Sequence, residues 1–240
     1  MVGADKAGIC NLAYSVSMIM TMFNSALLQT IEPWIYRKLK DKKAMDLARV
    51  AYSCFLLIAG VNILLILFAP EVIAVFAPKA YYEAIWVVPS VALSVFFMFL
   101  YSFFATFEFY YEKTNYVAAA TGGGAILNII LNYICIHKFG YLAAGYTTLF
   151  SYILFALLHY LFMNKVCDEF MDGARPYNGK IIFGIAVLSC AIGFGCMALY
   201  QQPIIRYSIV VLLGIATFVG RKKLISLIKS LLQLKKQKVE

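Results

Sequence analysis

The sequence predicts an all-α protein, a polytopic membrane bundle of about seven transmembrane helices. Of its 240 residues, 63% are hydrophobic and only 14% are charged. A water-soluble domain of this size could not cover so much apolar surface with so few charges. The apolar residues also form runs long enough to cross a hydrocarbon core of about 30 Å. We expect spans near residues 9–35, 48–69, 82–110, 117–137, 140–164, 179–200 and 203–220.

Charged residues gather between the expected spans. The loops after the first, third and fifth spans, together with the tail, hold 17 of the 21 Lys and Arg residues. The positive-inside rule therefore predicts an outside N-terminus and a cytoplasmic C-terminus. The net charge of +9 has the same explanation. No basic patch is interleaved with aromatic residues, so we expect no nucleic-acid partner.

The first span has one polar side. At about 100° per residue, six polar positions fall within a third of the helix circumference. They are Asn11, Ser15, Thr21, Ser25, Gln29 and Glu32. Pro33 follows and should bend the helix, because its ring removes one helical hydrogen bond. An outside N-terminus without a signal peptide also suggests that an amino-terminal portion is missing.

The second and sixth spans carry few polar groups, so we expect them to face lipid or to support the others. In the third span Ser90, Ser94, Tyr101 and Glu108 share a face, and Pro89 is expected to kink its outer end. Glu108 lies about one helical turn from the next loop, which predicts a position at the membrane interface.

The fourth and fifth spans form the centre of the prediction, joined by a short hinge at residues 137–140. Asn128 and Asn132 share a side of the fourth span with Thr121 and Gly124, and Thr148 and Ser151 share a side of the fifth. Buried amides in hydrocarbon need a partner or water, so they should point inward. Two interpretations stay open, since these amides can line a pathway or clamp the two helices together.

Three ionisable residues near span ends allow two interpretations each. Glu32 can carry a proton or cation beside the Pro33 bend, or form a salt bridge with Arg37 or Lys38. His159 can titrate near neutral pH, but we expect a histidine with a satisfied partner at the interface. Arg206 can meet an anionic headgroup, although snorkelling outward is expected.

The sequence shows no residue pattern that is typical of an enzyme active site. Gly122 to Gly124 has neither a strand before it nor the lysine of a phosphate loop after it, so it is a packing or flex point. The 168–175 stretch lacks the spacing of a phosphatidyltransferase motif. No Ser-His-Asp set, paired mid-membrane carboxylates or metal-ligand cluster is visible, so we expect neither an enzyme nor a cofactor. The six cysteines have no CxxC spacing and are interpreted as small apolar residues.

The chain divides into three expected parts: a transporter core at 1–164, two additional spans at 165–220 and a tail at 221–240. In the tail, basic residues alternate with leucine and isoleucine. This pattern predicts an amphipathic helix along the anionic inner membrane surface.

Several blocks resemble a known family. They are Leu127-Asn-Ile-Ile-Leu-Asn132, then Phe139-Gly-Tyr-Leu-Ala-Ala-Gly-Tyr-Thr-Thr-Leu-Phe-Ser-Tyr152, the turn Tyr111-Glu-Lys-Thr114, and the opening Gly3-Ala-Asp-Lys-Ala-Gly8 through Ala13-Tyr-Ser15. They are similar to the carboxy-terminal half of bacterial polysaccharide flippases, members of the multidrug/oligosaccharidyl-lipid/polysaccharide exporter superfamily. His137 departs from the family, which often has proline before the Phe-Gly turn. The resemblance covers roughly residues 3–164.

The resemblance implies a two-lobed transporter of about fourteen helices that works by alternating access. Its cargo would be an undecaprenyl-pyrophosphate-linked oligosaccharide, exported across the bacterial plasma membrane for surface polysaccharide assembly. This chain would be the carboxy-terminal lobe, and the missing amino-terminal lobe would supply the cations that bind pyrophosphate. Pro33 and Gly122 to Gly124 are candidate flex points. The expected substrate pathway consists of Asn11, Ser25, Gln29, Glu32, Tyr101, Glu108, Asn128, Asn132 and Thr148.

Two alternatives remain. A cation-coupled multidrug exporter of the same superfamily would need a buried mid-membrane carboxylate, and Glu32 and Glu108 are expected too near the cytoplasmic side. A membrane-embedded glycosyl or phosphoryl transferase would need paired acids and a metal site.

Overall fold

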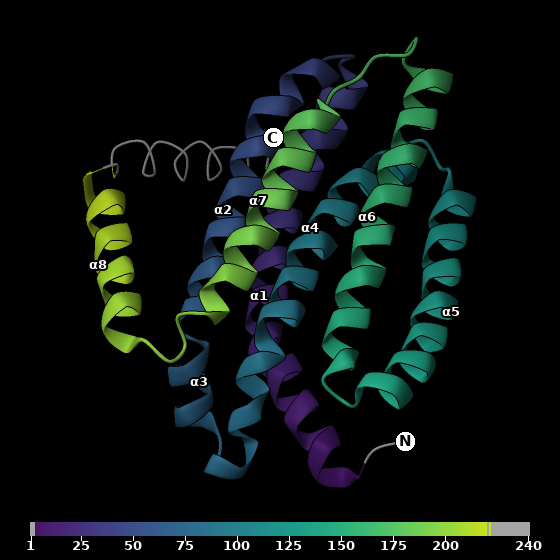
Figure 1. Ribbon diagram of the computed structural model, residues 1–240. Coiled ribbons are helices and arrows are strands. Elements are labelled where there is room, and N and C mark those ends of the chain that lie inside the picture. Colours follow the sequence, from purple (N-terminus) through teal and green to yellow (C-terminus); the bar gives the residue numbers. More distant parts are fainter. Residues whose placement is uncertain (1–2, 220, 222–240) are drawn as a thin grey trace.

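The computed structural model describes residues 3–219 and 221, and all the regular structure in this part is helical (Figure 1). The α-helices are α1 (Ala4–Lys40), α2 (Leu47–Leu67), α3 (Ala69–Phe76), α4 (Val88–Tyr110), α5 (Thr114–Phe139), α6 (Ala143–Phe170), α7 (Gly179–Met197) and α8 (Pro203–Val219). Two 3₁₀ segments, η1 (Ala44–Asp46) and η2 (Lys79–Trp86), precede α2 and α4. The all-α prediction is confirmed for the described residues.

Within residues 3–219 and 221, five helical segments are long and apolar enough to cross a membrane. They are Ala44–Leu67, Val88–Tyr110, Thr114–Phe139, Ala143–Phe170 and Gly179–Met197. This count differs from the predicted seven at the two ends of the chain. The 37-residue α1 is long enough to cross a membrane, but its polar residues make it less apolar than the five segments. In α8 the apolar stretch Pro203–Ile215 is too short to cross.

Two prolines behave differently. Pro33 lies inside α1, which continues to Lys40 as one helix. Pro89 stands in the first turn of α4, where a missing N–H leaves no helical hydrogen bond unmade. The predicted span 82–110 is interrupted just before Pro89, because η2 ends at Trp86 and α4 begins at Val88.

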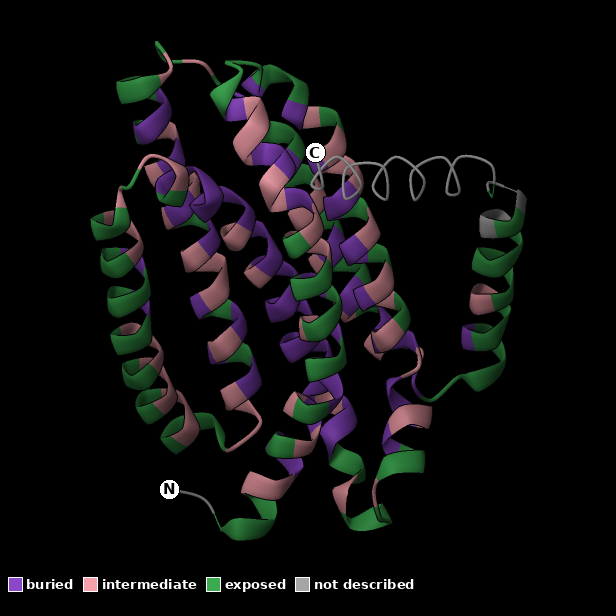
Figure 2. Cartoon of the chain, turned by 180° about the vertical axis from the view of Figure 1, so that it is seen from behind, coloured by how far each residue is buried: buried purple, intermediate pink, exposed green. Residues whose placement is uncertain are grey.

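Helix α4 is the axis of the bundle. In its most apolar stretch 83% of the residues are buried, against 11% in α5, as the burial colours show (Figure 2). A row of phenylalanines lies in this core: Phe96, Phe99, Phe103, Phe104 and Phe107. Phe55 of α2 meets three of these rings edge-on. Helix α5 contacts the bundle mainly through α6 and forms an outer layer.

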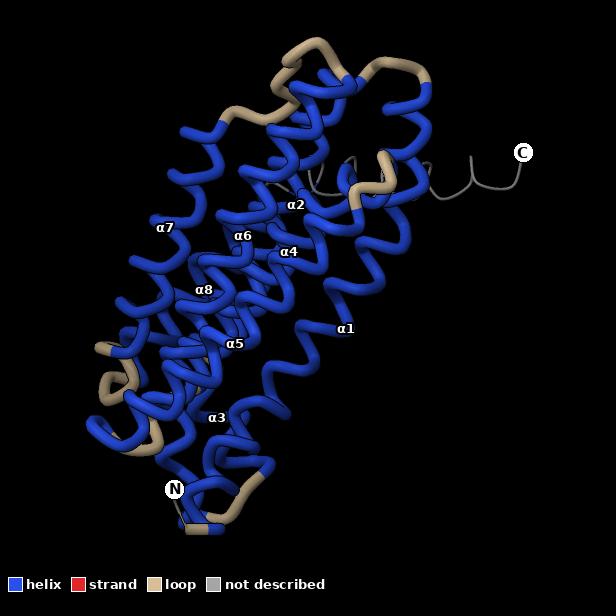
Figure 3. Tube along the Cα trace, turned by 90° about the vertical axis from the view of Figure 1, so that its right-hand side faces the viewer, coloured by secondary structure: helices blue, strands red, loops and turns tan. Residues whose placement is uncertain are grey.

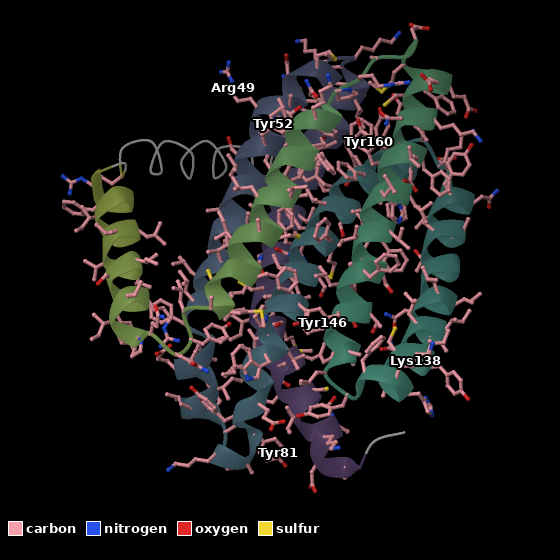
Figure 4. All side chains as sticks on the ribbon, viewed as in Figure 1. Arg49, Tyr52, Tyr81, Lys138, Tyr146 and Tyr160 are labelled. Atoms are coloured by element: carbon pink, nitrogen blue, oxygen red, sulfur yellow. The ribbon has the colours of Figure 1, made fainter. Side chains whose placement is uncertain are left out.

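Successive long helices run up and down, so the loops gather at two ends of the bundle (Figure 3). The start of α1, η2 and the α5–α6 and α7–α8 turns lie at one end, which we call the N-terminal end (Figure 1). The other end, which we call the basic end, holds the α1–α2, α4–α5 and α6–α7 loops. Figure 4 shows Arg49 near the basic end and Lys138 near the opposite one.

A hydrogen bond joins two loops at the N-terminal end. The phenol of Tyr141, in the α5–α6 turn, donates to a carboxylate oxygen of Glu83 in η2. Burial, followed by this hydrogen bond, raises the pKa of Tyr141 to about 12. The phenol thus remains protonated, and able to donate, across the physiological pH range.

Arg206 does not snorkel as predicted. Its side chain is 3% exposed and pairs with Glu71 of α3, which also accepts a 2.6 Å hydrogen bond from the Tyr207 hydroxyl. An ion pair between the buried Arg206 and the half-buried Glu71 therefore joins the start of α8 to α3. Apart from Arg221, the predicted basic tail lies outside the described residues.

Candidate functional site: a polar cavity between α1, α4, α5 and α6

A cavity of about 310 Å³ lies between α1, α4, α5 and α6, in the half of the bundle nearer the basic end. Its wall combines polar, aromatic and ionisable side chains. They are Leu28, Glu32, Tyr101, Ser102, Ala105, Thr106, Phe109, Val117, Thr121 and His159. A larger groove of about 710 Å³ between α2, α7 and α8 is lined almost wholly by apolar residues. We call the first one the polar cavity.

Glu108 and His159 form a buried pair at this cavity. The Nδ1 atom of His159 lies 2.9 Å from Oε1 of Glu108, and the two side chains are 1% and 0% exposed. Among the described residues, Oε2 of Glu108 has no hydrogen-bond partner. His159 itself lines the cavity wall, so the pair joins the α4–α6 contact to the polar space.

Both members of this pair are buried between α4 and α6. Their predicted position near the membrane interface concerns depth in the bilayer, which burial against a neighbouring helix does not measure, and it stays a prediction. The sequence did indicate that His159 has a satisfied partner, and the structure confirms it. The identity of the partner could not be predicted, because 51 residues separate Glu108 from His159.

Tyr101 covers His159 inside the cavity. Its ring stacks on the imidazole with centroids 5.3 Å apart and an interplanar angle of 24°. The same ring stacks on Tyr152 of α6, at 6.1 Å and 23°. Three flat side chains thus form one layered surface across α4 and α6.

Glu32 reaches the cavity from α1. It is half-buried, and its Oε1 accepts a 2.9 Å hydrogen bond from the hydroxyl of Tyr36 one turn later. Lys38, one of the two predicted salt-bridge partners, pairs instead with Asp46 at 2.7 Å. The Glu32 carboxylate is therefore positioned by its own helix on the cavity wall.

A second, smaller cavity of about 200 Å³ continues the seam between α1, α4 and α6 toward the N-terminal end. Thr148 lines it, and its Oγ1 lies 2.6 Å from the hydroxyl of Tyr14. Tyr152 lines this cavity too and stacks on Tyr101 of the polar cavity. Hydroxyl and aromatic groups therefore follow one seam through much of the bundle.

Asn128 and Asn132 clamp α5 to α6. Asn128 donates to the hydroxyl of Ser151 at 3.0 Å, and Asn132 donates to Oδ1 of Asn128 at 2.9 Å. Thr147 in turn donates to Oδ1 of Asn132 at 2.6 Å. Of the two interpretations left open by the sequence, these contacts favour the clamp. Neither asparagine lines the polar cavity.

The remaining pathway candidates lie on the outer face of α1. Asn11, Ser25 and Gln29 are exposed, and the Ser25 hydroxyl donates to the Thr21 carbonyl of its own helix. Asn24 was not predicted, yet it is fully buried and donates to the Val95 carbonyl of α4 at 2.8 Å. Its position outside the polar stripe of α1 was the available signal, since a buried amide there must meet another helix.

Removing one amide from the clamp should loosen the α5–α6 pair. We expect Asn132→Leu to lower the free energy of unfolding by about 0.6–1.7 kcal/mol, the range of interhelical hydrogen bonds in membranes. Asn11→Leu, at an exposed site outside the network, is the matched control and should change stability far less. Thermal unfolding in detergent measures both, and equal effects would contradict the clamp.

In the described part of the chain, no group of three His, Cys, Asp or Glu side chains is placed to hold a metal ion. The side chains at the polar cavity offer hydrogen-bonding groups, stacked aromatic rings and the Glu108–His159 pair. Compared with known proteins, the chain matches no family model, no curated protein and no solved structure.

Proposed function

We propose that this chain is the carboxy-terminal lobe of a transporter that exports an undecaprenyl-pyrophosphate-linked oligosaccharide across the bacterial plasma membrane. The observation that carries the proposal is the seam between α1, α4 and α6. Sugars offer hydroxyl groups and flat apolar faces. The seam supplies complementary partners, with Ser102 and Thr106 as hydrogen-bonding groups and Tyr101 and Tyr152 as stacking surfaces.

Sequence resemblance supports the same proposal. The blocks between Tyr111 and Tyr152 that resemble polysaccharide flippases lie in the turn before α5, in its second half and in the first turns of α6. The superfamily's alternating access requires a helix bundle with a polar interior route. Five helices long and apolar enough to cross a membrane are compatible with that architecture.

The charge of the cavity supports a second lobe. A pyrophosphate group needs Arg or Lys once it leaves water, but the polar cavity is lined by no Lys or Arg and by one carboxylate, Glu32. The exposed polar stripe of α1 runs beside the cavity, and facing lipid would be unfavourable for Asn11, Ser25 and Gln29. We therefore propose that a cationic amino-terminal lobe faces this side of α1 and binds the phosphates.

The proposed orientation follows from the charged loops. Lys6, Lys79 and Lys138 belong to the N-terminal end, while the other described lysines lie toward the basic end. With the basic end in the cytoplasm, the polar cavity lies in the cytoplasmic half of the bundle. The oligosaccharide would enter there, and the smaller cavity at Tyr14 and Thr148 would lie toward the outer leaflet.

Disrupting the gene for this chain in its host tests the proposed cargo. We expect surface polysaccharide to disappear and lipid-linked oligosaccharide to accumulate in a form that hydrolases added outside intact cells cannot reach. Restoring the gene on a plasmid is the control. Normal surface polysaccharide in the disrupted strain would overturn the proposal.

A cation-coupled multidrug exporter is the second candidate. The fully buried carboxylate of Glu108 favours it, because a carboxylate shielded from water is the element that such exporters need. Under this alternative, the disrupted strain keeps its polysaccharide but becomes sensitive to cationic drugs. The same strain therefore separates the two candidates.

A further inference from the structure

We propose that the smaller cavity between α1, α4 and α6 is a binding site for one uncharged sugar ring, and that Ser17 is the residue that recognises it. The inference rests on the proposed function and deepens it, because it names the kind of sugar residue that this lobe holds. The argument starts from a hydroxyl group that the fold leaves without a partner.

The hydroxyl of Ser17 is the observation that points to a ligand. Ser17 lines the smaller cavity, yet the residue is only 1% exposed, and its Oγ atom has no hydrogen-bond partner among the described residues. Leaving a buried hydroxyl without a partner is unfavourable. The other two serines of α1, Ser15 and Ser25, each donate to a carbonyl of their own helix. Ser17 differs from them because its hydrogen is available to a group inside the cavity.

Neighbouring hydroxyl groups offer acceptors in the same cavity. Ser94 of α4 donates to the Val91 carbonyl at 2.6 Å, and Thr148 of α6 donates to the Ala144 carbonyl at 2.9 Å. Both hydroxyl oxygens line the cavity and keep acceptor capacity after their hydrogens are used. A sugar hydroxyl is donor and acceptor at once. One ring can therefore accept from Ser17 and donate to Ser94.

The charge and size of the cavity select the ligand further. No Lys, Arg, His, Asp or Glu is among the described residues that line it, and the rest of the wall includes Met98 and Tyr152. A charged sugar would lose its water there without gaining a partner of opposite charge. At about 30 Å³ per water, the volume of about 200 Å³ has room for about six waters. One sugar ring can replace these waters, but two rings cannot.

The cavity opens at the surface of α1. Met18 and Thr21 line it, and Met18 is 58% exposed while Thr21 is half-buried. Thr21 belongs to the polar stripe of α1, which the proposed amino-terminal lobe would face. A sugar that passes between the two lobes would therefore meet this opening.

Binding of simple sugars to the full chain in lipid nanodiscs tests the inference. Methyl β-glucoside is the neutral probe, and methyl β-glucuronide, which has a carboxylate on the same ring, is the charged one. Saturation-transfer NMR measures the affinity of the chain for each probe. We expect the glucoside to bind and the glucuronide to bind at least about tenfold more weakly, because its carboxylate would be desolvated without a partner.

Ser17→Ala removes the hydroxyl and should weaken glucoside binding by about two- to tenfold, the usual contribution of one hydrogen bond. It should not lower the unfolding midpoint of the sugar-free chain, because the hydroxyl has no protein partner to lose. A merely structural role would give the opposite result on both measurements. Ser15→Ala, at an exposed site on the same helix, is the matched control and should bind like the wild type.

Three results would each overturn the inference: no glucoside binding to the wild type, equal binding of the two probes, or unchanged binding in Ser17→Ala. If Ser17→Ala does not fold, Met18→Trp at the exposed opening replaces it and should reduce glucoside binding by obstructing entry. The gene disruption described above decides the proposed function separately. Loss of surface polysaccharide in that strain without glucoside binding by the chain refutes only the present inference, whereas normal surface polysaccharide refutes the export proposal.

Discussion

Replacing His159 by leucine should be among the most damaging single changes in this chain. The substitution leaves Glu108 fully buried without its hydrogen-bond partner. Breaking a buried pair in this way typically costs about 3–5 kcal/mol. We expect the thermal unfolding midpoint in detergent to fall sharply and much of the protein to aggregate on purification.

The double variant Glu108→Leu/His159→Leu is the informative control. Replacing both members of a buried pair by apolar residues of similar volume is often neutral or stabilising. The double variant should therefore recover most of the stability that His159→Leu loses. Equal destabilisation in both variants would show that His159 stabilises the protein by its packing rather than by its contact with Glu108.

Gly124→Ala should have the second large effect. An added Cβ at this position would lie 1.8 Å from Cε1 of Phe155, a distance that forces the ring to move. Phe155 packs against Tyr101 and Tyr152, so the displacement reaches the aromatic layer of the polar cavity. Overpacking of this kind typically costs about 1–3 kcal/mol.

Gly122→Ala is the matched control, because no heavy atom lies within 4 Å of a Cβ added there. Exchanging glycine for alanine in an open helical position should stabilise α5 by up to about 1 kcal/mol. Unfolding midpoints of the two variants should therefore move in opposite directions. A loss of stability in Gly122→Ala would indicate that α5 needs flexibility at this point.

These glycines illustrate how far the sequence could predict the site. The triplet was interpreted as either a packing or a flex point, and the structure assigns close packing to Gly124 while Gly122 and Gly123 face open space. Helical periodicity could identify which residues share a face. It could not say which partner helix approaches that face, and only the partner distinguishes these neighbouring glycines.

The same limit explains the corrections elsewhere. Composition predicted the helical class, and the apolar runs located the helices, because both depend on residues close in the chain. The Glu108–His159 and Glu71–Arg206 pairs join residues 51 and 135 positions apart. Distance from a helix end is a property of one helix, whereas burial depends on which helices pack around a residue.

The asparagine clamp also bears on how the chain is assembled during synthesis. The four side chains from Asn128 to Ser151 satisfy one another within a single hairpin of two helices joined by a short turn. This hairpin can leave the translocation machinery with its amides already paired, before α7 has been made. In α1, by contrast, Asn24 donates to the Val95 carbonyl of α4 and Tyr14 pairs with Thr148 of α6, so these two contacts form only after α4 and α6 have been made.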